Sequence, residues 1–315
     1  MLVFTGKNCY TDFMNSKRQK YTKILPLLLI FLTLPVFIAS VNSDSAKQFN
    51  SSDLQKLIGK MILVEGFESE GVKADFQIGQ YEVTQELYEA VMGKNPSYYS
   101  NNPAEGENQA RRPVEYVTWY DALYFCNMLT SLTLGADECC YTITNIKFQK
   151  DDDELTENKF IKDAPTYKTY IQKADVTINH NKKGFRLPTR EEWLFAAKGG
   201  MKSQNYIYAG SNNLEEVGWY LSNSGKKTHE VGLLKPNELG IYDMSGNVNE
   251  FCEDLRFYTN TRNETFPRRI SSGGSAFYSK DSLPLEHFEN TLETPGNGGQ
   301  GFRIVCPAQT NVFRR

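Results

Sequence analysis

The fold is decided by one stretch in the second half of the chain, residues 239–250, which reads LGIYDMSGNVNE. Its short apolar runs are interrupted by Gly, Asn and Ser, and the same pattern extends from Gly200 toward the C-terminus. Turn residues at this density favour loops and brief strands over long helices. The sequence therefore predicts an α+β fold in which loops and short strands wrap around few helices.

Regular elements are expected mainly in the first two thirds of the chain. Residues 61–64 and 76–81 are predicted to form a strand and its partner, because both are apolar runs joined by a turn-rich segment. Three helices are predicted to begin after Thr84, Thr118 and Thr189. Each threonine is an N-cap candidate ahead of apolar residues on one helical face, and an acidic residue three positions after the second and third completes a capping box.

A hairpin-like arm is predicted over residues 139–183. Its strands are 141–143 and 176–178, which both carry β-branched residues. The acidic run 151–154 lies between them and is expected to be a solvated loop.

The N-terminal segment has a signal-peptide pattern. Four basic residues between positions 17 and 23 precede the apolar run 24–39, which is shorter than the ~20 residues that a spanning helix needs. An uncleaved anchor is the alternative, and Met14 is a possible true start. The predicted organisation is a signal peptide at 1–43, a linker at 44–57, one domain at 58–308 and a tail at 309–315.

The composition and the expected export limit the classes of partner that this protein could bind. Charges are nearly balanced, with 35 basic and 38 acidic side chains and a net charge of -3, so a nucleic-acid partner is not expected. The mature protein is expected to be periplasmic, exposed on the cell surface or secreted, without a stable membrane span. In such oxidising compartments disulfides persist.

Cysteines offer two interpretations. Five follow the apolar run: Cys126, Cys139, Cys140, Cys252 and Cys306. Their odd number leaves at least one outside any internal disulfide, and the adjacent Cys139 and Cys140 are not expected to pair because the short connection strains the bridge. The alternative is that several are small, buried, apolar residues.

Six motifs follow one another in a specific order along the chain. They are 81–84 (YEVT), 113–119 (PVEYVTW), 185–193 (FRLPTREEW), 239–250, 273–275 (GGS) and 301–303 (GFR). As a set, covering roughly residues 58–307, they resemble the formylglycine-generating enzyme (sulfatase-modifying factor) family. The resemblance implies a single compact, loop-rich domain related to the C-type lectin fold, with little regular secondary structure and bound calcium.

The resemblance also implies where catalysis would occur. Enzymes of the family oxidise a cysteine in an unfolded sulfatase segment to formylglycine, using copper held by two cysteines just after the Gly-Gly-Ser turn. In this chain Tyr278 and Leu283 stand at those places. Neither a phenol nor an alkyl group replaces a thiolate as a Cu(I) ligand, so copper is not expected and no catalytic residue is assigned.

Two further expectations come from the resemblance. Iron-dependent relatives hold their metal with histidines of an additional helical domain, but His180, His229 and His287 are scattered here and give such a site little support. The family's enzymes bridge a helix cysteine to the C-terminal strand, and the analogous pair is Cys126 with Cys306.

Calcium ligands are expected within the deciding stretch. Asn247 and Glu250 can offer side-chain oxygens and Val248 a carbonyl, which is the hard oxygen environment that Ca²⁺ prefers. A second calcium loop of the family matches Asn223 and Ser224, although the carboxylate expected after it is absent. The alternative for both loops is a turn in which Asn and Ser satisfy the backbone.

A ligand-binding surface is expected between residues 276 and 300, where aromatic and short polar side chains are held by a rigid frame. Its candidates are Phe277, Tyr278, His287, Phe288 and Asn290. The leading hypothesis is an exported, calcium-stabilised scaffold that binds a protein or glycan and does not catalyse copper-dependent oxidation. The alternatives are an oxidoreductase or iron-dependent relative with a non-standard active site, or side chains that only cover the fold.

Overall fold

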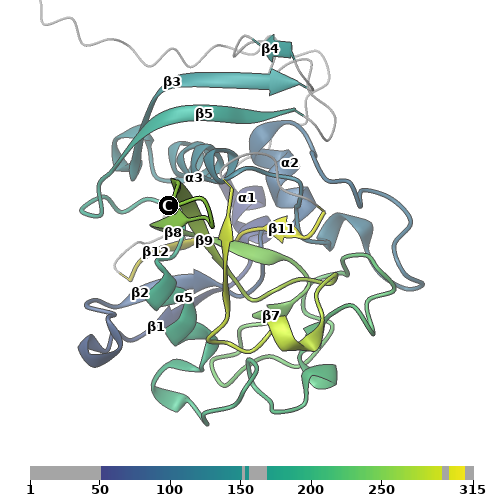
Figure 1. Cartoon of the computed structure of the whole chain (residues 1–315). Helices are drawn as coiled ribbons and strands as arrows, with labels where there is room; N and C mark the ends of the chain where they lie inside the picture. The colour runs from purple at the N-terminus through teal and green to yellow at the C-terminus, as the bar shows by residue number, and fades with distance from the viewer. Residues whose placement is uncertain (1–50, 151–152, 156–168, 293–297, 309–315) are drawn as a thin grey trace, which may run out of the picture. The chain divides into compact units, whose positions relative to one another are not determined.

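The computed structural model describes residues 51–150, 153–155, 169–292 and 298–308 (Figure 1). The chain divides into two units, Met1–Asp44 and Ser45–Arg315, and all described residues belong to the second. The predicted signal peptide at 1–43 and tail at 309–315 therefore lie outside the described residues. Within the described ranges, no helix combines the length and apolar character needed to cross a membrane.

The α-helices of the described residues are short and lie before residue 200. They are α1 (Ser51–Ile58), α2 (Gln85–Met92), α3 (Trp119–Thr133) and α5 (Arg190–Ala197). From Gly200 onward the described residues form no α-helix, as predicted. The strands there are not all brief, because Asn249–Thr259 and Thr265–Ser272 span 11 and 8 residues.

The three predicted helices begin at their predicted N-caps. Thr84 caps α2, while Thr118 and Thr189 cap α3 and α5. Thr118 Oγ1 accepts a hydrogen bond from Asp121 N at 3.0 Å, and the Asp121 carboxylate accepts one from Thr118 N at 2.9 Å. Thr189 and Glu192 form the same reciprocal pair. Both capping boxes are therefore confirmed.

The first helix corrects the predicted linker. Residues 44–57 were expected to lack structure, yet Ser51–Ile58 form α1. Leu54 is 1% exposed, and Ile58 joins the same core with Leu57 packed against it. These three apolar side chains are spaced as on one helical face, and their burial outweighs the polar composition that favoured a linker.

The strands of the described residues form four small sheets. The first sheet has the order β1-β2-β12 and contains β1 (Met61–Val64), β2 (Phe76–Gly79) and β12 (Val305–Pro307). The second has the order β10-β9-β8-β11 and contains β8 (Asn249–Thr259), β9 (Thr265–Ser272), β10 (Phe288–Thr291) and β11 (Gln300–Gly301). The third has the order β4-β3-β5, with β3 (Tyr141–Lys150), β4 (Asp153–Leu155) and β5 (Thr169–Ile178), and the fourth pairs β6 (Gly218–Trp219) with β7 (Ser245–Gly246). The predicted pairing of these two segments, β1 and β2, is confirmed and is antiparallel, with Met61 opposite Gly79, where β2 ends two residues before the predicted limit.

The predicted arm is confirmed as the antiparallel pair β3–β5, with Tyr141 opposite Ile178. It lies against α3 (Figure 1), where Asp121 Oδ1 accepts a hydrogen bond from Ile171 N at 2.9 Å. The loop predicted for 151–154 is corrected in part, because Glu154 lies in β4 opposite Gln149.

Two large apolar clusters form most of the core of the described residues. One surrounds α2 and α3 and contains Trp119, Phe125 and Phe302; the other lies between the β1-β2-β12 sheet and α5 and contains Ile78 and Trp193. Both are built from segments far apart in sequence. The C-terminal residues 302–306 contribute to each and so tie the end of the domain to its beginning.

The disulfide implied by the resemblance is wrong. Cys126 of α3 is a buried thiol that is not bonded to Cys306. Cys306 lies on β12 opposite Gln77, and the ionisable neighbour that most affects the Cys126 thiol is Cys140. Burial raises the pKa of Cys126 well above its usual range, which keeps the thiol protonated.

One fully buried carboxyl group makes fold stability depend on pH. Glu115 Oε1 accepts a hydrogen bond from Tyr99 N at 2.7 Å, while Oε2 has no hydrogen-bond partner among the described residues. Burial raises the pKa of Glu115 to about 8, and backbone hydrogen bonds from Tyr99 and Tyr98 only partly oppose it. The folded state therefore binds this proton more tightly than the unfolded chain does.

We expect Glu115→Gln to stabilise the protein at about pH 9 and to have little effect at about pH 5. The raised pKa stabilises the fold below the unfolded value of 4.5, and this contribution is lost as the pH rises through about 8. Thermal unfolding, followed by circular dichroism at both pH values, measures the effect. Each kcal/mol of added stability should raise the melting temperature by about 2–4 °C. The exposed Glu65→Gln serves as control. An equal shift at both pH values would contradict the account.

Candidate functional site

The deciding stretch turns its polar residues into the core. Gly246 of β7 has φ +91°, and a Cβ at this position would collide with the carbonyl oxygen of Trp219 on β6. The turn therefore requires glycine. It brings Asn247, Val248 and Glu250 to positions with no solvent exposure.

Glu250 is held by an arginine and a tryptophan. Its Oε2 accepts hydrogen bonds from Arg303 Nε at 2.6 Å and Trp193 Nε1 at 2.7 Å, and its Oε1 accepts one from Arg303 Nη2 at 2.6 Å. Glu250 and Arg303 are both completely buried. The carboxylate thus already has a cation in bidentate geometry.

Asn247 and Val248 are also engaged by the chain itself. Asn247 Oδ1 accepts a hydrogen bond from His229 N at 2.9 Å, and its Nδ2 donates to Glu82 at 2.8 Å. Val248 N donates to the same Glu82 carboxyl at 3.1 Å. Since a calcium ion needs several oxygen ligands that are not balanced by another cation, these side chains as arranged do not fit one.

At the second predicted calcium loop, the His229 ring contacts the backbone oxygen of Ser224. Asn223 Oδ1 accepts a hydrogen bond from Tyr220 N at 2.7 Å, and Ser224 Oγ donates to Ala276 O at 2.7 Å. The ring of His229 lies 2.7 Å from Ser224 O through Nε2 and 2.6 Å from Glu107 Oε1 through Nδ1. Among the described residues, His, Cys, Asp and Glu side chains form no cluster of three or more suited to a metal ion.

The places of the family's copper ligands are filled by an apolar cluster. Leu283 is 1% exposed and packs with Leu214 and Tyr220, and Tyr278 packs against this cluster. Burial raises the pKa of the Tyr278 hydroxyl. These side chains provide neither a soft ligand nor an activated nucleophile.

The structure divides the predicted ligand-binding surface into two parts. Phe277 stacks on Tyr99 with ring centroids 5.5 Å apart, and Tyr278 belongs to the apolar cluster. His287, Phe288 and Asn290 lie on or beside β10 instead. His287 is exposed and pairs with Glu289 at 2.9 Å, Asn290 is exposed, and Phe288 is partly buried against α5 and β8.

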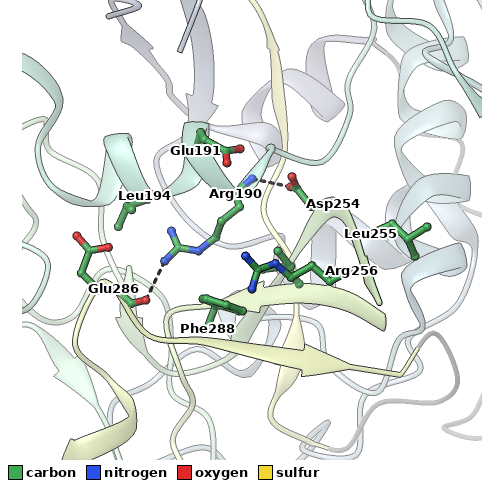
Figure 2. Close-up of a pocket in the computed structure, with 9 residues that line it drawn as sticks. Arg190, Glu191, Leu194, Asp254, Leu255, Arg256, Glu286 and Phe288 are labelled. Atoms are coloured by element: carbon green, nitrogen blue, oxygen red, sulfur yellow. Dashed lines mark hydrogen bonds between the residues drawn. The ribbon is translucent and has the colours of Figure 1, made fainter. Parts of the chain in front are cut away.

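Phe288 lines a cavity of about 280 Å³ between α5, β8 and β10 (Figure 2). Its charged lining residues are Arg190, Glu191, Asp254, Arg256 and Glu286, and its apolar ones are Leu194, Leu255, Ile270 and Phe288. Sequence reasoning found Phe288 and the segment that contains Glu286. The other lining residues come from a helix and two strands that only the fold brings together.

Arg190 is the most unusual residue of this cavity. It is 8% exposed, and its Cζ lies 5.8 Å from the ring centroids of both Trp193 and Phe288. Nη2 donates to the carbonyl oxygens of Leu285 and Glu286 at 3.1 and 3.3 Å, whereas Nε and Nη1 have no hydrogen-bond partner among the described residues. Burial lowers the pKa of this guanidinium.

The described residues form a loop-rich domain of mixed helices and strands, of the class to which sulfatase-modifying enzymes belong, with Tyr278 and Leu283 where the resemblance implies copper cysteines. The chain belongs to the family of sulfatase-modifying factor enzyme 1-like domains, which matches residues 65–308. The predicted family and fold class are therefore confirmed.

Three relatives illustrate the family. The chain is 41% identical over 250 residues to the chaperone protein LppX of Paenibacillus barcinonensis, covering 74% of this chain and 80% of that protein. It is 34% identical to the solved structure of Treponema denticola variable protein 1, with a TM-score of 0.61 over 79% of this chain and 96% of the other. A shorter match, 35% over 79 residues, links 22% of this chain to 26% of the inactive C-alpha-formylglycine-generating enzyme 2 of Bos taurus.

We expect Glu250→Gln to lower the free energy of unfolding by about 3–5 kcal/mol, because an amide leaves the buried charge of Arg303 unbalanced. The loss should be equal in calcium and in a calcium chelator, as measured by denaturant unfolding. Glu65→Gln, at an exposed position, serves as control. A loss confined to calcium-containing buffer would instead identify Glu250 as a calcium ligand.

Proposed function

We propose that this protein is an exported, non-catalytic member of the family that binds unfolded polypeptide, in the manner of a chaperone. The observation that carries the proposal is the apolar cluster of Tyr278 and Leu283 at the place of the copper cysteines. A domain that retains the frame but has lost the metal ligands keeps the capacity to bind without the capacity to oxidise.

The relatives favour polypeptide over glycan as the ligand. LppX, which the chain matches over most of both lengths, is named a chaperone. The family's enzymes act on an unfolded protein segment, so extended polypeptide is the ligand that the ancestral surface accommodates. Such binding does not require calcium, because Asn247 Oδ1 and the Glu250 carboxylate are engaged by other groups of the chain.

The ribbon formed by β8 and β9 supplies a surface for such a ligand. Phe257 is 70% exposed, Tyr258 46% and Phe266 39%, with Tyr258 directly opposite Phe266. Leu255, which is 45% exposed, lies on the same face of β8 as Phe257, whereas Tyr258 and Phe266 lie on the opposite face of the ribbon. Exposed apolar groups gathered on one element indicate an interaction surface.

We expect no conversion of cysteine to formylglycine in an unfolded sulfatase-type peptide incubated with the purified domain, Cu(I) and oxygen. Mass spectrometry of the peptide measures the result, with an active family enzyme as the positive control. Turnover above the copper-only background would contradict the proposal and favour an oxidoreductase with a non-standard active site.

We expect the protein to slow the aggregation of denatured citrate synthase, as measured by light scattering. Replacing Phe257 and Tyr258 together by Ser should remove most of this protection while the melting temperature stays close to that of the wild type. Replacing Met201 and Leu233 by Ser is the matched control, since these side chains are 60% and 49% exposed and lie outside the ribbon. Absence of protection by the wild type would refute the chaperone function.

A further inference from the structure

We propose that one face of the β8–β9 ribbon selects unfolded segments in which an acidic residue lies two positions from an apolar or aromatic one. This inference rests on the proposed function and names the class of polypeptide that the ribbon prefers. The face carries two cross-strand pairs, Arg256 opposite Arg268 and Tyr258 opposite Phe266, and we call it the arginine face.

The first pair places two positive charges side by side. Arg256 and Arg268 are directly opposite residues of antiparallel strands, so their side chains leave the same face from Cβ atoms about 4.5–5.5 Å apart. Like charges in this arrangement destabilise a strand pair unless an anion lies between them. A ligand carboxylate placed there contacts both guanidinium groups and removes the repulsion.

The acids beside this pair are not its counter-ions. Asp254 and Glu286 line the same cavity as Arg256, but Asp254 accepts a hydrogen bond from the first backbone N–H of α5 and Glu286 pairs with a lysine, each at 2.6 Å (Figure 2). Glu191, the third acid of that cavity, is exposed to solvent. Among the described residues, no carboxylate forms an ion pair with Arg256 or Arg268.

Both guanidinium groups are positioned by aromatic rings and remain available to a ligand. Arg256 is exposed, its Cζ lies 4.6 Å from the Phe288 ring centroid, and it has no hydrogen-bond acceptor among the described residues (Figure 2). Arg268 lies with Cζ 5.7 Å from the Phe266 ring centroid and donates from Nη1 to Pro267 O at 3.3 Å. A guanidinium over a ring keeps its nitrogen edge free for a carboxylate.

The aromatic pair lies one side-chain step further along the same face. Tyr258 and Phe266 are directly opposite each other and are 46% and 39% exposed. Two residues of an extended chain span about 6.6 Å, so acidic and apolar side chains two positions apart match the two pairs. Glu264 lies beyond the aromatic pair, where it accepts a hydrogen bond from Asn260 Nδ2 at 2.7 Å. The charge and the spacing together define the preferred segment.

The opposite face of the ribbon has no such pair of cations. There Leu255 lies opposite Arg269, and Phe257 lies opposite Pro267. The Arg269 guanidinium is engaged by the fold, because its Cζ lies 3.5 Å from the Trp119 ring centroid and its Nη1 donates to a backbone carbonyl oxygen at 3.3 Å. This face therefore offers apolar contact, and selection by charge belongs to the arginine face.

The end of the ribbon favours a polypeptide over a lipid surface. Residues 260–264, which connect β8 to β9, read NTRNE and are polar throughout. Tyr258 and Phe266 lie behind this connection, so a membrane could receive the aromatic rings only after the polar residues had entered it. Burial of polar groups in hydrocarbon is costly, whereas a peptide that lies along the face leaves them in water.

The test compares three short peptides with blocked ends by isothermal titration calorimetry. One has a glutamate two positions from a phenylalanine, the second has glutamine in place of the glutamate, and the third places the glutamate directly beside the phenylalanine. Wild-type protein should bind the first about threefold to tenfold more tightly than the second, and the difference should shrink at high salt because the charges are exposed. The third should bind less tightly than the first, since adjacent side chains of an extended chain face opposite ways.

Variants assign the effect to the arginine face. Arg256→Gln combined with Arg268→Gln should abolish the preference for glutamate while the glutamine peptide still binds. The melting temperature should not fall, because the double substitution removes repulsion between opposed charges. Lys60→Gln combined with Lys202→Gln is the matched control, which removes two exposed positive charges outside the ribbon and should leave the preference unchanged.

The outcomes separate this inference from the proposed function. Equal binding of the glutamate and glutamine peptides, with protection of citrate synthase intact, would overturn the selection by charge and leave polypeptide binding in place. Absence of binding by the glutamate peptide would overturn it as well, and the aggregation assay then decides whether polypeptide binding also fails. A preference that persists in the arginine double variant, or displacement of the peptide by phosphatidylglycerol vesicles, would overturn the assignment to this face and ligand.

Discussion

The buried ion pair between Glu250 and Arg303 is the contact on which the arrangement of the domain depends. Arg303 also donates to Gly79 O at the end of β2 and to Tyr242 O in the deciding stretch, each at 3.0 Å. Glu250 reaches Trp193 of α5. One charged pair thus joins the first sheet, the central turn, a helix and the C-terminal segment. Because every nitrogen of this guanidinium has an acceptor, the pair meets the condition under which a buried charge is tolerated.

This pair also engages oxygen atoms that the resemblance assigns to calcium. At the deciding stretch a cation of the chain itself, Arg303, balances Glu250. At the second loop the imidazole of His229 occupies the space between Ser224 O and the Glu107 carboxylate. Hard oxygen ligands that elsewhere would surround a metal are therefore satisfied within the chain, and both turns keep their shape through hydrogen bonds.

The sequence was informative where structure depends on neighbours along the chain. Thr118 with Asp121 and Thr189 with Glu192 are local pairs, so their spacing alone predicted the helix starts. The order of motifs predicted the family and fold class. The Arg190 cavity could not be found in this way, because its walls come from separated elements and a helical arginine is normally solvated. The predictions of a linker at 44–57 and of a Cys126–Cys306 disulfide were wrong, because neither composition nor positional analogy reports which side chains are buried or bonded.

The ion pair and the cavity are connected through Trp193. Its Nε1 is fixed by Glu250, and its ring forms one side of the sandwich around Arg190. Arg190 itself is the first residue of α5, whose start is fixed by the capping box of Thr189 and Glu192. The guanidinium is thus held by rigid elements on both flanks. The helix cap, the buried ion pair and the tryptophan ring therefore act together to fix the position of one buried arginine.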